Sequence, residues 1–154
     1  MHKKGFTLIE LLIVVAIIGI VAAIAIPNLL VALQKGKQKA TIGDLKSVGT
    51  SLEVYMTDNS MVPNTDLATL SNSSFFIPFY IKVLPTRDAW GTLWDYVSGV
   101  SPSDQYSVTS YGRDKIALPT IDGLYQVTKL TDFNNSITYS NGQFSVGPVI
   151  VVKK

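Results

Sequence analysis

Cysteine is absent from the 154 residues, and histidine occurs only once, at His2. Without cysteine the chain forms no disulfide and no thiolate metal site, so neither can hold a loop-rich region together. A single imidazole beside the N-terminus also leaves no means of assembling a Ser-His-Asp or Cys-His catalytic group. These absences argue against an enzyme and favour a structural or binding role.

Charge is scarce as well, because Asp, Glu, Lys and Arg make up only 16% of the residues. The 13 basic and 11 acidic residues give a formal net charge of +2, and Lys3 and Lys4 account for that excess. The rest of the chain shows no basic footprint of the kind that binds nucleic acid, so we expect no nucleic-acid partner. The length suits one folded domain.

Apolar residues are abundant, at 47% of the total, and they are concentrated in a run from Leu11 to Ile26. An ordinary secretory signal would be cut after the small-residue site Ala23-Ile24-Ala25 and would release a soluble protein. A signal anchor would stay uncut, because a helix continued to Leu33 spans about 34 Å, enough to cross a bilayer.

Glu10 supports a third interpretation, since placing a carboxylate in a membrane costs about 2.5 to 3.5 kcal/mol on insertion scales. Such carboxylates are usually paired, but no cation occurs between Phe6 and Gln34. Cleavage between Gly5 and Phe6 would create one, because the new α-amino group would lie one helical turn from Glu10. That amino group could also meet Glu10 of a neighbouring copy.

The N-terminus resembles the class III signal of prepilins, the precursors of the type IV pilin-like family. In this resemblance a basic leader, residues 1–5, ends at Gly5, and Phe6 and Glu10 become the first and fifth mature residues. Gly19 and Pro27 also fall where the family has them. The resemblance implies that a membrane-embedded prepilin peptidase cuts after Gly5 and methylates the new N-terminus.

The same resemblance implies a cytoplasmic leader, a single span of the bacterial inner membrane and a head in the periplasm. Charge counting alone does not decide the orientation, because Lys35, Lys37 and Lys39 follow the apolar run. Before assembly the apolar helix would lie in membrane lipid. After assembly it would pack with other copies in a helical homopolymer, built with an inner-membrane assembly platform as partner.

After Pro27 the pattern becomes amphipathic, with apolar residues at three- and four-residue steps, which predicts a helical stripe. The stripe comprises Ile42, Leu45, Val48, Leu52, Tyr55 and Met56. We expect one helix from about Phe6 to Thr57, with residues 6–33 as its transmembrane and assembly half and 34–58 as its amphipathic half. It should stop at Asp58-Asn59-Ser60, where turn formers accumulate.

Pro27 and several glycines weaken or reshape the predicted helix. Pro27 cannot donate to the carbonyl of Ala23, so the stretch from Gly19 is weaker than its hydropathy suggests. This weakness predicts either a kink or, as filaments of the resembled family imply, a loss of helicity when subunits pack. Further glycines at 36, 43 and 49 permit bending or close packing.

Residues 59–154 should form a head with an antiparallel sheet, because strand-like patches alternate with turn clusters. The patches are Leu93–Val97, Tyr106–Ser110, Leu124–Leu130 and Ile137–Ser140. Asn141-Gly142 predicts a tight hairpin from Ile137–Ser140 to Gln143–Val146, because both turn residues tolerate positive φ. Pro148 should interrupt the chain after this hairpin, and Val149–Val152 would form one more short strand or edge. The aromatic residues between 75 and 96 are better suited to core and interface packing than to sugar binding.

The segments Asp88–Tyr96 and Tyr106–Asp114 resemble the head of major pseudopilins of type II secretion systems, which carry an Asp-x-Trp-Gly turn, a strand and a Gly-x-Asp loop. The resemblance implies that the loop binds calcium through the carbonyl of Tyr111 and the carboxylates of Asp114 and Asp122. The chain departs from the family at Lys115, where glycine is usual, and it lacks the glycine-rich stretch that normally comes after it. The segment from Leu124 onward is also longer than expected.

These observations predict an α+β, pilin-like subunit with a long N-terminal helix packed on a small antiparallel sheet. The expected function is structural, as the major pseudopilin of a type II secretion-like system that drives protein export. Two alternatives stay open on the sequence: a surface type IV pilus subunit for adhesion or motility, and a membrane-anchored domain that never polymerises.

Overall fold

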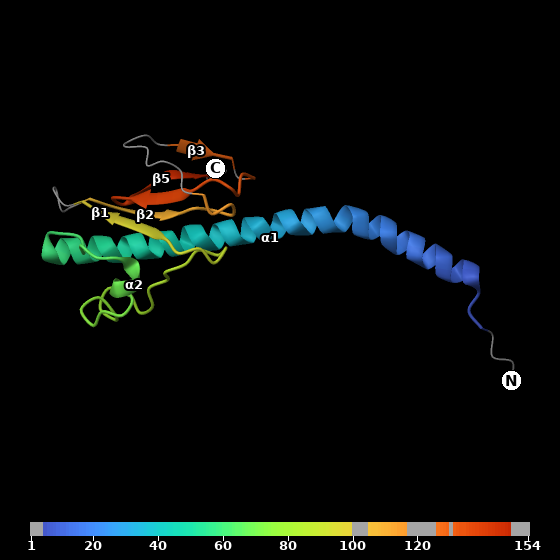
Figure 1. Cartoon of the computed structure of the whole chain (residues 1–154), viewed down its shortest axis with the longest axis horizontal. Coiled ribbons are helices and arrows are strands. Elements are labelled where there is room, and N and C mark those ends of the chain that lie inside the picture. Colours follow the sequence, from blue (N-terminus) through green and yellow to red (C-terminus); the bar gives the residue numbers. More distant parts are fainter. Residues whose placement is uncertain (1–4, 100–104, 117–125, 130, 149–154) are drawn as a thin grey trace, which may run out of the picture. The chain divides into compact units, whose positions relative to one another are not determined.

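The computed structural model describes residues 5–99, 105–116, 126–129 and 131–148. The chain divides into two units, Met1–Gln34 and Lys35–Lys154, which are described separately. Helix α1, Leu8–Asn59, belongs in part to each unit, and α2, Leu67–Leu70, lies in the second. The strands are β1 (Asp95–Ser98), β2 (Tyr106–Ser110), β3 (Gln126–Thr128), β4 (Ile137–Ser140) and β5 (Gln143–Pro148) (Figure 1).

The first unit consists mainly of the apolar part of α1, and its side chains are almost all exposed. An 18-residue window of α1 has a mean hydropathy of 3.1 with none of it buried, so this helix is long and apolar enough to cross a membrane. An apolar helix with no protein around it needs lipid or other apolar helices as its surroundings.

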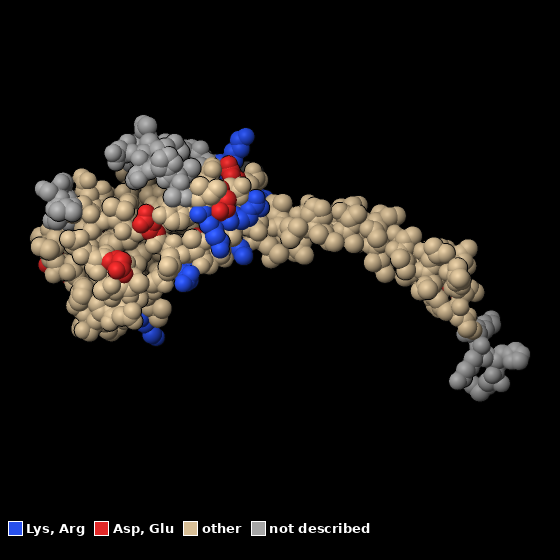
Figure 2. Space-filling view, in the orientation of Figure 1, with Lys and Arg blue, Asp and Glu red and all other residues tan. Residues whose placement is uncertain are grey.

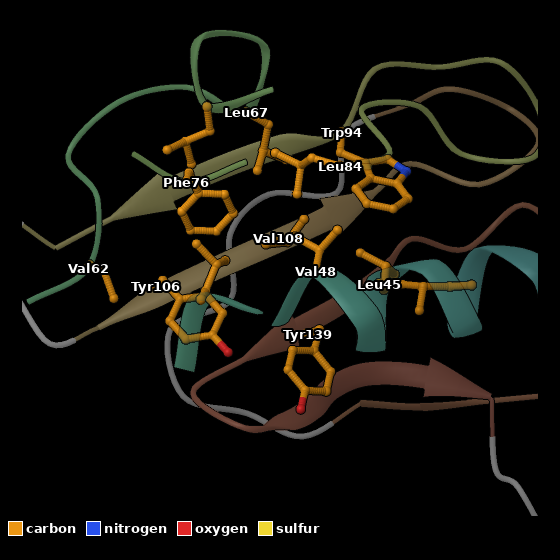
Figure 3. Close-up of a cluster of buried hydrophobic side chains, with 13 residues drawn as sticks. Leu45, Val48, Val62, Leu67, Phe76, Leu84, Trp94, Tyr106, Val108 and Tyr139 are labelled. Carbon is orange, nitrogen blue, oxygen red and sulfur yellow. The ribbon is translucent and has the colours of Figure 1, made fainter. Parts of the chain in front are cut away.

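In the second unit the predicted stripe of α1 is confirmed, because Leu45, Val48 and Leu52 are fully buried. They pack against side chains from the loop between α1 and β1 and from strands β2 and β4 (Figure 3). That core consists of Val62, Leu67, Leu70, Phe76, Leu84, Trp94, Tyr106, Val108, Ile137 and Tyr139 together with the three helix residues. Burial of each such aliphatic or aromatic side chain contributes about 1.5 to 3 kcal/mol.

The sheet has the order β1-β2-β4-β5-β3. Neighbours from β1 to β5 pair antiparallel, which confirms the expected α+β architecture. β2 alternates buried and half-buried residues, so Tyr106, Val108 and Ser110 face the core. The inward face of β4 adds Ile137 and Tyr139, as the period-two pattern of a half-buried strand requires.

The predicted hairpin is also confirmed. Asn141 and Gly142 have φ values of 45° and 88°, and they join β4 directly to β5. Both positive values are typical of the two-residue turn whose twist matches its flanking strands. The predicted end of α1 is likewise confirmed, since the helix ends at Asn59 and Ser60 follows with a φ of 58°.

Several details differ from the sequence-based expectation. β3 pairs parallel with β5, so the sheet is mixed at one edge, and within the described residues this strand covers only Gln126–Thr128. Pro148 does not interrupt β5 but is the last of its residues, where it is paired with Thr128 of β3. The first strand begins at Asp95 rather than Leu93, and α2 was not predicted. The predicted strand Val149–Val152 lies outside the described residues.

Candidate functional site

The predicted processing point, Gly5-Phe6, lies ahead of α1 in chain without regular structure. Both residues are exposed, and the Phe6 side chain is 73% exposed. A peptide bond outside a helix has no helical hydrogen bonds to break before a protease can bind it as an extended strand. The local structure is therefore compatible with cleavage at this bond.

Glu10, the predicted assembly residue, lies in the first turn of α1 and is held by Thr7. The Thr7 backbone N–H donates to Glu10 Oε2 at 2.8 Å, and the Thr7 hydroxyl donates to the same oxygen at 2.6 Å. In return the Glu10 N–H donates to Thr7 Oγ1 at 3.4 Å. This reciprocal arrangement is a capping box, and it satisfies amide groups that begin a helix without partners.

Thr7 was missed by the sequence analysis, although the pattern Thr-x-x-Glu before an apolar run is the known signal for a capping box. Both Thr7 bonds end on Oε2 of Glu10. Among the described residues no hydrogen bond reaches Oε1, so this oxygen is available to a further donor.

Gly19 and Pro27 both lie inside α1, which continues through them without a break. A Cβ added at Gly19 would meet nothing within 4 Å, so no close contact within the described residues requires a glycine there. Just after Pro27, the Asn28 side-chain amide donates to the Ile24 carbonyl at 3.1 Å and supports the turn that the proline weakens. Loss of helicity between Gly19 and Pro27 on packing stays a prediction about the assembled state.

In the second unit, Asp88 forms the centre of a buried polar turn. Its Oδ1 accepts the N–H groups of Trp90 at 3.0 Å and Thr92 at 2.8 Å. Its Oδ2 accepts the Ser110 hydroxyl at 2.8 Å, at the end of β2. Because a buried carboxylate needs several donors, this side chain is structural and ties the 88–92 turn to the sheet. The sequence analysis placed Asp88 in the Asp-x-Trp-Gly turn by resemblance, but nothing local in the sequence revealed its contact with Ser110.

The loop after β2 passes close to the segment before β4. Gly112 has a φ of 73°, and a Cβ there would lie 2.7 Å from the carbonyl oxygen of Asn135 and 3.0 Å from that of Phe133. The Arg113 N–H donates to the Phe133 carbonyl at 2.8 Å, and its Nε donates to Asn134 Oδ1 at 2.9 Å. Only glycine fits this close approach of two backbone segments.

The predicted calcium ligands are only partly described. Asp114 is exposed, and one of its oxygens accepts the Ile116 N–H at 3.1 Å. Lys115 follows with a φ of 61°, while Asp122 lies outside the described residues. No group of three or more Asp, Glu, His or Cys side chains suited to a metal is found in the described part of the chain. These residues alone therefore do not complete a calcium site, and further ligands would have to come from residues 117–125.

The Tyr111 side chain has a separate role from the backbone carbonyl predicted as a ligand. It lies near Asp95 on β1, and burial of the phenol together with this carboxylate raises its pKa. The contact ties the start of the loop to the edge strand of the sheet.

Glu53 on α1 binds the sheet through two tyrosines. The Tyr106 hydroxyl donates to Glu53 Oε1 at 2.9 Å and also approaches the Gly49 carbonyl at 3.1 Å, while the Tyr139 hydroxyl lies 3.5 Å from Glu53 Oε1. Burial raises the pKa of both phenols, and the Glu53 carboxylate raises it further. Both tyrosines therefore stay neutral donors at physiological pH.

Comparison with known families gives two matches. The prokaryotic N-terminal methylation motif matches residues 1–26, and the family described as type II secretion system (T2SS), protein G, matches residues 28–119. The first match covers the capping box and the predicted cleavage point, and the second covers the Asp88 turn, β1 and β2.

Individual relatives agree with the family match. The chain is 35% identical over 115 residues to a type II secretion system core protein G of Vibrio cholerae, covering 69% of this chain and 76% of that protein. It is 32% identical over 125 residues to the protein of the same name from Pseudomonas aeruginosa, covering 73% and 87%. The corresponding protein of Escherichia coli K12 is 33% identical over 124 residues, covering 73% and 83%. No solved structure is a significant match.

Proposed function

We propose that this chain, which belongs to the protein G family of type II secretion systems, the major pseudopilins, is the filament-forming subunit of such a system. In this role it serves protein export as a structural component, without enzymatic activity. The observation that carries the proposal is the exposed apolar helix that begins with a Thr7–Glu10 capping box. A helix of this kind is stable in lipid and, with its one charge paired, in a bundle of identical helices.

The free Oε1 of Glu10 suggests how copies join. After cleavage, the Phe6 amino group of a neighbour, or of the same chain, would donate to Oε1 while Thr7 continues to hold Oε2. A charge-assisted bond of this kind is stronger than one between neutral groups, and in an apolar bundle it offsets the cost of removing both charges from water.

Processing is the first test of this proposal. We expect the mature chain to begin at Phe6 and to carry one N-methyl group, and to need a prepilin peptidase for both changes. Intact mass and N-terminal sequencing of the chain purified from its host measure this directly. A mature start at Ile26 would identify an ordinary secretory signal and would overturn the filament proposal.

Export is the second test. A host that lacks this chain should retain folded secretion substrates in the periplasm, and re-expression of the chain should release them. Re-expression of a variant with Gly5→Leu, which blocks the small-residue cleavage site, should produce membrane-bound chain without restoring export. Normal export in the absence of the chain would show that it serves another filament or none.

We also propose two partners that accord with this function. An inner-membrane assembly platform would draw the subunit from the bilayer into the filament. One calcium ion would be held by the Tyr111 carbonyl, Asp114 and Asp122, where it would supply positive charge that brings the ends of the loop together. Support for the ion comes from the family resemblance and from the exposed Asp114 carboxylate.

A further inference from the structure

Lysine and arginine side chains gather at one end of the second unit, with few carboxylates among them (Figure 2). Three exposed lysines come from the first helical turns of this unit, and three exposed cations come from the loops after β2 and β3. The set, named here the basic patch, comprises Lys35, Lys37, Lys39, Arg113, Lys115 and Lys129. Among the described residues its carboxylates are Asp114 and Asp132, so positive charge predominates there.

Hydrogen bonds hold the loops that carry Arg113 and Lys129 close to the helical turn that carries the lysines. The buried Gln38 side chain approaches the Asp132 carbonyl, with Nε2 and the oxygen 3.5 Å apart. Asp132 in turn donates its N–H to the Lys129 carbonyl at 2.9 Å, and Arg113 donates to Phe133 at 2.8 Å. The patch is therefore one surface built around the helix turn at Gln38.

In the sequence, the helix lysines follow the apolar segment directly. Leu33 is the last apolar residue of the segment, and Lys39 follows it by about 9 Å of helix rise. The polar headgroup layer on each side of a bilayer is roughly 5 to 8 Å thick. A helix that crosses the bilayer up to Leu33 therefore carries Lys35, Lys37 and Lys39 through that layer.

The helix lysines lie on two sides of α1. At about 100° of rotation per residue, Lys35 and Lys39 lie about 40° apart on one side of the axis, and Lys37 lies on the other side. All three are exposed, whereas Gln38 faces the loop at Asp132. Cations on two opposite sides of a helix suit a surrounding layer of anionic groups better than a single partner face.

An exposed apolar side chain lies within the same patch. Ile116 is 64% exposed and directly follows Lys115, close in sequence to Arg113. An aliphatic side chain flanked by cations is typical of segments that lie in the interface of an anionic membrane. If the head is periplasmic, three lysines just outside the span oppose the positive-inside preference. We therefore expect these lysines to make a favourable interaction that offsets this cost.

We propose that the basic patch binds the anionic phospholipid headgroups of the leaflet from which the head emerges, with Ile116 entering the interface. This contact would hold the unassembled head against the membrane in a fixed orientation. It rests on the membrane anchor of the proposed function but not on filament formation. Each cation near an anionic surface favours the docked state roughly fivefold.

Headgroup quenching in vesicles tests the proposal on the full chain. Because the chain has no cysteine, a dye can be placed at Ile116→Cys and, as a control, at Phe79→Cys. Phe79 is 80% exposed and precedes Tyr80, whose ring packs 5.1 Å from that of Tyr55, about 25 Å further along α1 than Gln38. Nitroxide on lipid headgroups should quench the first dye in vesicles with phosphatidylglycerol, but not in phosphatidylcholine alone, and about 0.5 M salt should abolish the difference. The dye at position 79 should not respond.

Matched charge variants complete the test. Lys37→Gln with Lys39→Gln should lower the ratio of docked to undocked heads about 30-fold. Lys46→Gln with Lys82→Gln, at exposed positions outside the patch, should change it little. Equal quenching in both lipids, or equal effects of the two pairs, would overturn the headgroup contact. So would unchanged quenching with a lower filament yield, which would assign the lysines to a second copy. A chain that does not float with vesicles would overturn the anchor itself.

Discussion

At the start of α1, the capping box and the proposed amine pairing use different oxygens of Glu10. Thr7 occupies Oε2 of Glu10 through its amide and its hydroxyl, so the carboxylate is already oriented before any other copy is present. An oriented acceptor loses less entropy when a second donor arrives. Glu10 was predictable from the sequence because a lone carboxylate is costly in lipid. Its bonds to the neutral Thr7 follow from the capping-box spacing and not from charge.

Glu10→Ala should separate insertion from assembly. Removal of the carboxylate makes membrane insertion easier, so the amount of membrane-bound chain should stay level. Filament yield should fall, because the Phe6 amino group would be left unpaired in an apolar bundle at a cost of around 3 to 5 kcal/mol. Sheared-filament yield and membrane content, measured by immunoblot, test both statements.

Glu10→Gln is the control for this variant. Glutamine keeps an oxygen that can accept from Thr7 but carries no charge to offset the amine, so it should assemble as poorly as Glu10→Ala. Parent-like assembly of Glu10→Ala would show that the amine pairing is wrong. Parent-like assembly of Glu10→Gln alone would show that Glu10 acts through the capping box.

Among the elements, α1 packs on the sheet closely enough to require a glycine at one point. A Cβ at Gly49 would overlap the ring carbons of Tyr139, which is 4% exposed and also contacts Phe144 edge-on. At Gly43 a Cβ would meet nothing within 4 Å. The sequence suggested close packing or bending for both glycines and could not separate them, because the difference depends on β4, far along the chain.

Gly49→Ala should destabilise the second unit, whereas Gly43→Ala should stabilise it. Overpacking typically costs about 1 to 3 kcal/mol, which exceeds the gain of up to about 1 kcal/mol from alanine's helix propensity. Gly43→Ala overpacks no contact, so only the gain in helix propensity remains. Urea unfolding of the isolated Lys35–Lys154 unit measures both variants, and equal stabilities for the two would contradict the close contact with Tyr139.

The other elements differ in how far local sequence determines them. The hairpin at Asn141-Gly142 was predictable because its two positive φ values are a local requirement. The parallel pairing of β3 with β5 was not, since it depends on where distant chain is brought by the core. The same holds for the cluster of Tyr55, Phe76 and Tyr80 rings, whose centroids lie between 5.1 and 5.8 Å apart. Aromatic composition predicted packing there, but not the partners.

For the molecule as a whole, the boundary between the apolar segment and the head was predictable from the sequence, because the two parts need different surroundings. Residues from Leu11 to Leu33 need an apolar environment, and the remainder carries an alternating pattern that folds in water. The pattern does not specify how loops are held without disulfides. In the described residues this role falls to polar contacts, such as the buried bond of Asp88 with Ser110 at 2.8 Å and the backbone bond of Arg113 with Phe133.

Calcium would add a further restraint of the same kind, and the thermal stability of the isolated Lys35–Lys154 unit tests it. An ion that binds only the folded form at a hundredfold excess over its Kd stabilises that form by about 2.7 kcal/mol. For a unit of this size we expect calcium to raise Tm by roughly 10 °C relative to chelator. Asp114→Ala should abolish the difference, whereas Asp58→Ala, at an exposed position in the last turn of α1, should retain it. The same Tm with millimolar calcium and with chelator would show that the loop from Tyr111 to Asp122 holds no ion, and that Lys115 marks a divergence from the calcium-binding members of the family.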